Sequence, residues 1–161
     1  MGYDEVIKIL LDNGEYLQGE LDSSLRYACT HGKLNVVKLL VEYGADIHTD
    51  EDAPVMVSAV NNRIDIVKYL VSKGADIQKR NNLPLQRAAY YGHIEMIKLL
   101  VSYGANIQDD HNASLKDAVK EGQLEAVKLL LKLGANANDV SDIHMKYGEK
   151  NKIFTDCFFA N

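Results

Sequence analysis

Residues 83–108 read LPLQRAAYYGHIEMIKLLVSYGANIQ, and this stretch decides the fold. Pro84 favours the first turn of a helix, where its missing N–H costs no hydrogen bond, and Gly92 is the kind of residue that ends a helix. Apolar residues then recur at the spacing of one helix face, namely Ile94, Ile97, Leu100 and Val101. This spacing predicts a second helix, which Gly104 ends. We call the two predicted segments helix A and helix B.

The same pattern returns every 30 residues. Glycines end helix B in five copies, at Gly14, Gly44, Gly74, Gly104 and Gly134. The residues that end helix A keep the same phase, at Gly32, Asn62, Gly92 and Gly122. A fixed period of this length indicates a solenoid, in which each unit buries its apolar face only against its neighbours. Helices of about ten residues are too short to be stable alone, so stacking must stabilise them.

Some positions of the repeat hold the same kind of residue in every copy. Helix A carries a pair of small or short side chains, at Ala28-Cys29, Ser58-Ala59, Ala88-Ala89 and Ala118-Val119. Helix B carries a pair of large ones, at Leu39-Leu40, Tyr69-Leu70, Leu99-Leu100 and Leu129-Leu130. We expect both sets to form the core, because small residues let neighbouring helices approach closely.

Residues 83–108 resemble the ankyrin repeat, whose pattern runs Thr-Pro-Leu-His-x-Ala-Ala-x-x-Gly-His before helix B and Gly-Ala-Asp after it. The resemblance covers four units over residues 22–138, preceded by a lone helix B at residues 4–13. It implies an all-α solenoid of helix-turn-helix units with short hairpin fingers, because the period is 30 residues and not the usual 33 or so. We predict a partial repeat over 1–14, four repeats over 15–138, and a degenerate repeat or C-terminal cap over 139–161.

The family's Thr and His are missing from the start of helix A. The pairs at those positions are Ser23 and Arg26, Ala53 and Met56, Leu83 and Gln86, and Ala113 and Lys116. The resemblance implies that this Thr and this His normally form hydrogen bonds at the start of helix A and between neighbouring repeats. Their absence therefore predicts a softer array.

The short, 30-residue repeats, with segments such as KYLVSKGADI at residues 68–77, resemble the repeats in the ankyrin proteins of giant viruses that infect amoebae. That resemblance implies a host cell's cytoplasm as the location.

The three phenylalanines, Phe154, Phe158 and Phe159, all lie in the final eight residues. This tail is interpreted as a hydrophobic lid on the last full repeat, or alternatively as an exposed hook that recruits a partner such as the host ubiquitination machinery.

Composition narrows the classes of function. The formal net charge of −5 argues against binding to nucleic acid, which needs clustered Lys and Arg. The longest apolar runs are too short to cross a membrane. Cys29 and Cys157 are too few and too far apart for a disulfide framework, and the five histidines show no ligand spacing, so neither a metal nor a cofactor is expected. No catalytic motif is present, which predicts a non-enzymatic, monomeric, intracellular protein.

Recognition is expected where the repeats differ, at the last two positions of helix A. These positions, which we call the recognition columns, hold Thr30-His31, Val60-Asn61, Tyr90-Tyr91 and Lys120-Glu121. The resemblance places them on the concave, partner-binding face of ankyrin proteins. Tyrosine is enriched among binding hot spots, so the pair at 90–91 is the predicted anchor, although one of the two could simply pack on its neighbour repeat.

Lys79 and Arg80 precede the same repeat, between acidic fingers at residues 50–52 and 109–110. This arrangement suggests a partner with an acidic or polar centre and basic margins. The sequence thus predicts a protein-interaction module that acts as an adaptor or sequestering scaffold. The alternative is a remnant of an expanding repeat family that has no dedicated partner.

Overall fold

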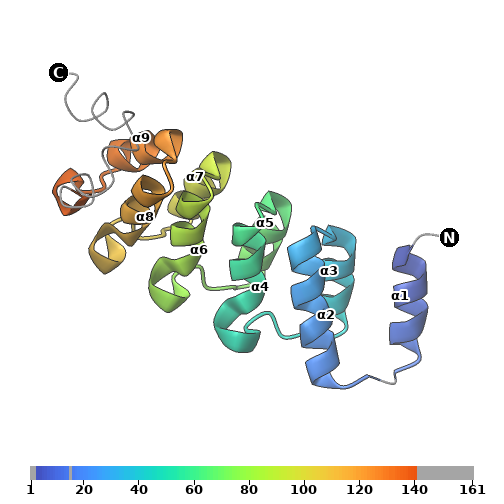
Figure 1. Ribbon diagram of the computed structural model, residues 1–161. Coiled ribbons are helices and arrows are strands. Elements are labelled where there is room, and N and C mark those ends of the chain that lie inside the picture. The colour runs from blue at the N-terminus through green and yellow to red at the C-terminus, as the bar shows by residue number, and fades with distance from the viewer. Residues whose placement is uncertain (1–2, 15, 141–161) are drawn as a thin grey trace. The chain divides into compact units, whose positions relative to one another are not determined.

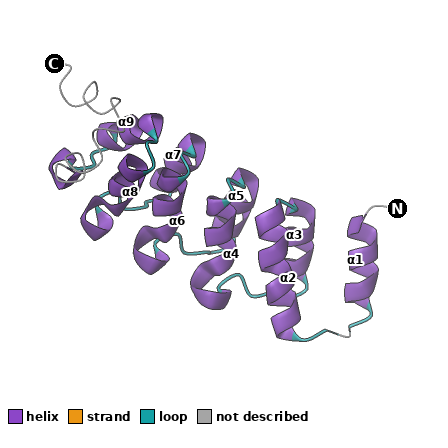
Figure 2. Cartoon of the chain, viewed as in Figure 1, coloured by secondary structure: helices purple, strands orange, loops and turns teal. Residues whose placement is uncertain are grey.

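The computed structural model describes residues 3–14 and 16–140, and these residues form helices and turns without a strand (Figures 1 and 2). The chain divides into two compact units, Met1–Asp76 and Ile77–Asn161. The first unit contains α1 (Tyr3–Asp12), α2 (Gln18–His31), α3 (Leu34–Glu42), α4 (Thr49–Val60) and α5 (Ile64–Ser72). The second unit contains α6 (Lys79–Tyr90), α7 (Ile94–Ser102), α8 (Asp109–Lys120), α9 (Leu124–Lys132) and a 3-10 helix, η1 (Ala137–Val140). The predicted all-α repeat fold is confirmed.

Helix A of each repeat is α2, α4, α6 or α8, and helix B is α3, α5, α7 or α9. Within each unit the two helices of a repeat pack together, and helix A packs on helix A of the next repeat: α2 on α4, and α6 on α8. Helix B packs on helix B in the same way, as α7 does on α9. The lone predicted helix B is α1, which packs on α3.

The predicted core columns are buried. Both members of each small pair in helix A are buried, including Ala88 and Ala89 with no exposed surface. The two members of each large pair in helix B differ in burial. The second member is buried, at Leu40, Leu70, Leu100 and Leu130, whereas the residue before each of them is only half-buried. The second residue of each pair therefore anchors the core.

Helix A ends in a left-handed residue in every repeat, as predicted. Asn62 adopts a φ of 54°, close to the φ of 69° at Gly92. Asparagine tolerates this conformation better than most residues with a side chain, so the exchange preserves the turn.

The connection into helix A is a left-handed turn and not a strand hairpin. Three consecutive residues have positive φ in each of three repeats, at residues 50–52, 80–82 and 110–112. The right-handed helix follows this turn, so Pro54 and Pro84 lie in its first turn, where proline is favoured. Left-handed residues other than glycine cost about 1–2 kcal/mol each, so other bonds must offset the turn.

Side-chain hydrogen bonds from one repeat to the next provide that offset. The Oδ1 atoms of Asp22, Asp52, Asn82 and Asn112 accept from the backbone N–H groups of Asp46, Asp76, Asn106 and Asn136, at 2.8–3.0 Å. We call these four bonds the amide clamp. Three of the acceptors, Asp52, Asn82 and Asn112, are buried. A buried acceptor of this kind must keep its donor, because losing it leaves an unsatisfied polar group.

A second set of bonds runs parallel to the amide clamp. The Nε2 groups of Gln18, Gln78 and Gln108 each donate 2.9 Å bonds to the carbonyl oxygens of Gly44, Gly104 and Gly134. The family's missing Thr and His therefore do not leave the repeats without hydrogen bonds between them. The amide clamp connects helix A to the start of the finger that follows its repeat, and the glutamine bonds connect helix A to the end of helix B in the same repeat, which changes the basis for expecting a softer array.

Candidate functional site

The predicted tyrosine anchor lies at the end of α6. Tyr91 is 49% exposed, and Tyr90 is half-buried. Their rings meet edge to face, with centroids 4.9 Å apart, and the Tyr91 ring stacks on the His93 ring at 5.7 Å. Edge-to-face and offset stacked pairs are the favoured arrangements of aromatic rings. Tyr91 is thus held by its neighbours while half of its surface faces solvent.

Tyr90 is engaged within its unit. Its hydroxyl group is hydrogen-bonded to the Glu121 side chain, and the charge of that carboxylate raises the pKa of Tyr90. The Arg87 guanidinium lies over the Tyr90 ring, 5.9 Å from its centroid. Tyr90 therefore links α6 to the end of α8, which matches the alternative that one tyrosine packs on its neighbour repeat. Of the pair, Tyr91 therefore stays the candidate anchor.

The recognition column of α8 is charged. Lys120 and Glu121 are both exposed, and Lys120 Nζ lies 3.9 Å from Asp117 Oδ1. Burial raises the pKa of Asp117, and the charge of Lys120 opposes this rise. Exposed pairs at this distance contribute little to stability, so Lys120 can exchange its partner at small cost.

Lys79 and Arg80 are exposed at the start of α6, in the left-handed turn. Three carboxylates of the flanking acidic fingers, which were expected to contact basic margins of a partner, have bonds within the chain. Asp50 pairs with Arg26, Asp109 accepts a hydrogen bond from Asn82, and Asp52 belongs to the amide clamp. These carboxylates serve the fold, so they give no support to the expected basic margins of a partner.

In the first unit, the recognition columns combine polar and apolar groups. Thr30 Oγ1 donates to the Arg26 carbonyl at 2.9 Å, and Asn61 Nδ2 donates to the Val57 carbonyl at 2.8 Å. Val60 is half-buried and His31 is exposed. The polar members are thus fixed by bonds to their own helices.

Tyr27 was missed by the sequence analysis. It is 67% exposed, and its ring stacks on the His31 ring with centroids 4.0 Å apart. A signal was present, since the equivalent positions hold Val57, Arg87 and Asp117 and so differ in every repeat. The rule that separates fixed from variable positions would have found this residue one helical turn before the recognition column.

The ends of α2 and α6 are also tied to the following repeat. Arg63 Nε donates to the Thr30 carbonyl at 3.1 Å, and Gln123 Nε2 donates to the Tyr90 carbonyl at 3.2 Å. Carbonyl groups at a helix end lack partners inside the helix, so a donor side chain stabilises them. These two bonds fix the backbone that carries the recognition residues.

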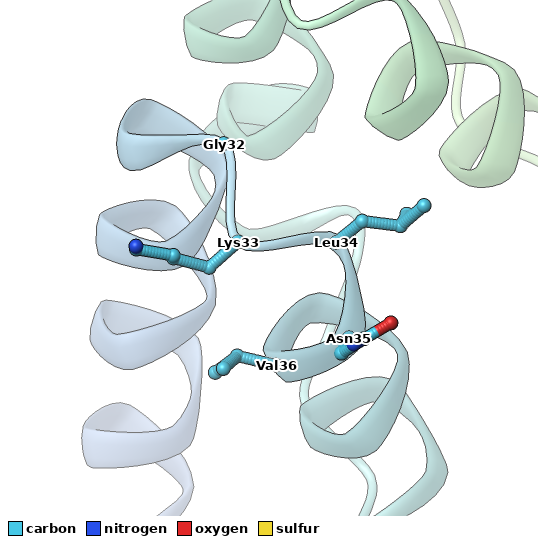
Figure 3. Close-up of a pocket in the computed structure, with 5 residues that line it drawn as sticks. All are labelled: Gly32, Lys33, Leu34, Asn35 and Val36. Carbon is cyan, nitrogen blue, oxygen red and sulfur yellow. The ribbon is translucent and has the colours of Figure 1, made fainter. Parts of the chain in front are cut away.

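A hollow of about 390 Å³ lies beside the turn between α2 and α3 (Figure 3). It is lined by Gly32, Lys33, Leu34, Asn35 and Val36. None of these residues belongs to the recognition columns. The hollow therefore adds nothing to the candidate site.

The structure describes two ranges of the chain, 3–14 and 16–140. Within them, His, Cys, Asp and Glu side chains do not gather in groups of three or more that could hold a metal ion. The thiol of Cys29 is buried, and burial raises its pKa to about 11. His144, Cys157 and the Phe-rich tail lie outside the described residues. The helices found in the same ranges are too short or too polar to span a membrane.

A family model of known proteins matches the chain. The family model described as "Ankyrin repeats (3 copies)" matches residues 1–81 and again residues 78–141. Ankyrin repeats generally mediate protein–protein interaction and typically act without catalysis. No curated protein matches the chain. The narrower resemblance to viral ankyrin proteins therefore stays a prediction.

Proposed function

Since the chain belongs to the ankyrin-repeat family, we propose that it is a non-enzymatic protein-binding module whose partner contacts the ends of the A helices. It acts as an adaptor or sequestering scaffold. This proposal rests on the change from buried, recurring small residues to an exposed residue that differs between repeats, which occurs at the end of α6. Ala88 and Ala89 are buried and recur as small residues in other repeats, whereas Tyr91 is exposed and differs from its counterparts. Packing does not require an aromatic ring there.

Each unit carries a proposed binding surface of its own. In the second unit, Tyr91 is the anchor, with the exposed charged groups of Lys79, Arg80, Lys120 and Glu121 around the same two repeats. In the first unit, the stacked pair of Tyr27 and His31 is the corresponding anchor. Exposed tyrosine is favoured in binding because it supplies both apolar area and a hydroxyl group.

Mixed charge on the second unit's surface favours a protein partner over nucleic acid. Lys120 and Glu121 are adjacent, and the whole chain has a net charge of −5. A phosphate backbone would meet repulsion from such a surface, whereas a protein with interspersed charges would not. On the viral resemblance, we place the protein in the cytoplasm of a host cell, as a monomer.

The test is affinity capture from an amoeba lysate on three immobilised proteins: the wild type, Tyr91→Ala and Tyr103→Ala. Tyr103 is also exposed, at 39%, but it lies at the end of helix B and outside the recognition columns. We expect a stoichiometric partner on the wild type and on Tyr103→Ala, and at least a tenfold smaller amount on Tyr91→Ala. Circular dichroism melts verify that all three proteins are folded. Equal capture by all three would contradict the assignment of Tyr91, and the absence of any stoichiometric partner would favour the repeat remnant.

A further inference from the structure

Three lysines of the first unit lie around a single aromatic ring on the B helices. The Nζ atoms of Lys38 in α3 and Lys73 at the end of α5 lie 5.9 and 5.7 Å from the centroid of the Tyr69 ring. Lys68 precedes Tyr69 in α5, and all three lysines are exposed. Helices α3 and α5 pack on each other, which brings these residues close together. We call Lys38, Lys68, Lys73 and Tyr69 the lysine patch.

The lysines at the same helix positions are neutralised in the second unit. Lys98 and Lys128, which stand in phase with Lys38 and Lys68, form ion pairs with the glutamate three residues earlier, at 2.6 and 3.0 Å. Lys38 lacks this partner because Asn35 stands at that position. In the part of the chain that the structure describes, no carboxylate forms an ion pair with any lysine of the patch. The charges of the patch are therefore open to an external anion.

The charge of this surface contrasts with that of the rest of the chain. The B helices of the first unit with their flanking residues, 33–43 and 63–73, hold five of the chain's 18 Lys and Arg residues and two of its 23 Asp and Glu residues, a formal charge of +3. The equivalent segments of the second unit, 93–103 and 123–133, together have a formal charge of +1 with His neutral. Since the whole chain has a net charge of −5, the residues outside the two segments of the first unit carry −8. Positive charge is thus concentrated on one pair of helices.

Tyr69 gives the patch a feature that the other repeats lack. Leucine occupies the equivalent positions 39, 99 and 129. An ammonium group within about 6 Å of a ring centroid is attracted to the ring face, so Tyr69 draws Lys38 and Lys73 toward each other. Burial, and to a smaller extent the charge of Glu42, raises the pKa of Tyr69, so the ring is uncharged near neutral pH and does not repel an anion. Long side chains that are already ordered lose less entropy on binding.

We propose that the lysine patch is a second protein-binding surface of this chain, which takes a short acidic segment of a partner, rich in Asp or Glu. Each ammonium group has three N–H donors, and carboxylates accept charge-assisted hydrogen bonds from them. This surface is distinct from the proposed site at the ends of the A helices, because its residues belong to α3, α5 and the position directly after α5.

A short acidic segment fits the patch better than a long polyanion does. The exposed carboxylates of Glu42 and Asp65 lie on the same two helices, and the rest of the chain is strongly negative. A nucleic acid or an anionic membrane would extend beyond the three lysines and meet this repulsion. A peptide of a few acidic residues gains the attraction of the patch without that cost.

The test is fluorescence anisotropy of a hexaglutamate peptide that carries a neutral dye, titrated with the full chain at low ionic strength. We expect saturable binding that weakens at least fivefold with the double variant Lys38→Gln and Lys73→Gln. The matched control is Lys98→Gln with Lys128→Gln, which removes the same amount of charge from the B helices of the second unit and should change the affinity less than twofold. A hexaglutamine peptide should not bind. All four lysines are exposed, so both double variants should keep the circular dichroism spectrum of the wild type.

Further measurements separate the patch from general charge effects. Raising the salt from about 0.02 to about 0.2 M shortens the Debye length from about 20 to about 7 Å, so the affinity should fall at least fivefold. Tyr69→Leu keeps every lysine and copies the residue of the other repeats, and it should weaken binding about twofold. Tyr91→Ala should bind the peptide as the wild type does, which keeps this test independent of the proposed site at the ends of the A helices.

Three outcomes would overturn the proposal. The first is the absence of saturable binding by the wild-type chain, and the second is an equal loss of affinity for the patch variant and its control. The third is tighter binding of a DNA hexamer than of the peptide, or sedimentation with phosphatidylserine vesicles that the patch variant abolishes, because either result assigns the patch to a phosphate-bearing polyanion. Unchanged affinity of Tyr69→Leu would overturn the role given to the ring.

Discussion

The side-chain Oδ1 atom of Asn82 accepts a 3.0 Å hydrogen bond from the backbone N–H of Asn106, 24 residues further along the chain. Asn82 is 4% exposed and adopts a φ of 55°, so one residue both closes a left-handed turn and holds the beginning of the next finger. The amide clamp thus couples a locally unfavourable backbone to a bond that only the stacked repeats can form.

Removing this acceptor should destabilise the second unit. Asn82→Leu leaves the Asn106 N–H without its partner, and we expect a loss of about 1–3 kcal/mol in the free energy of unfolding. Asn82→Asp is the matched control, since Asp52 makes the equivalent bond to Asp76. Urea denaturation followed by circular dichroism measures both variants. Equal losses for Leu and Asp would show that the bond contributes nothing.

The turn after α6 should tolerate asparagine better than alanine. Gly92 has a φ of 69°, and a Cβ atom there would lie 2.4 Å from Gln123 Oε1, whose amide caps the Tyr90 carbonyl. We expect Gly92→Ala to cost about 1–2 kcal/mol from the left-handed backbone alone, and more from the displaced glutamine. Gly92→Asn should cost less on the backbone, as Asn62 demonstrates at the same position.

A double-mutant cycle separates these two costs of Gly92→Ala. If the glutamine clash matters, the cost of Gly92→Ala should be smaller in a Gln123→Ala background. Strictly additive effects in urea denaturation would instead assign the whole cost to the backbone.

The two tyrosines of α6 should differ in their effect on stability. Tyr90 is half-buried and bonded to Glu121, so Tyr90→Ala is expected to lower the unfolding free energy by more than Tyr91→Ala does. Tyr91→Ala removes an exposed ring and should change it by less than about 0.5 kcal/mol. Paired urea titrations measure this difference. The reverse order would make Tyr91 the structural residue of the pair.

Stability should fall above pH 9 because of Cys29. Burial raises the pKa of the Cys29 thiol from 9.0 to about 11, so between these values the unfolded chain ionises while the native thiol stays protonated. The unfolded state then binds fewer protons, and the unfolding free energy decreases by up to about 1.4 kcal/mol per pH unit. Cys29→Ala, which copies Ala59 and Ala89, is the control. Its unfolding free energy should fall less between pH 9 and 10, and parallel curves would contradict the assignment.

Much of the fold could be predicted because the residues that end the helices and those that pack between them recur at the same positions of every 30-residue repeat. The left-handed conformation of Asn62 followed from its place in the column of Gly32, Gly92 and Gly122, and the buried small pairs followed from their constancy. The left-handed turns could not be predicted in the same way. Glu51 and Arg80 have positive φ, yet neither residue type favours that conformation.

The amide clamp was missed for a related reason. Asn112 and Asn136 are far apart in sequence, and a single repeat contains no local pattern that pairs them. Their column does hold only Asp or Asn, which would have revealed it. At the candidate site, the position of Tyr91 was predicted, whereas the engagement of Tyr90 by Glu121 depends on how two repeats pack. Whether either tyrosine binds a partner is a question for the capture experiment.

The amide clamp has a consequence for how such a gene can grow. Every thirty-residue segment encodes one acceptor for the segment ahead and one donor for the segment behind. An in-frame duplication of one segment therefore creates a new junction whose bonding groups already match, without any compensating substitution. Lengthening or shortening the chain by whole segments preserves this junction chemistry, while the variable side chains at the helix ends are free to diverge afterwards.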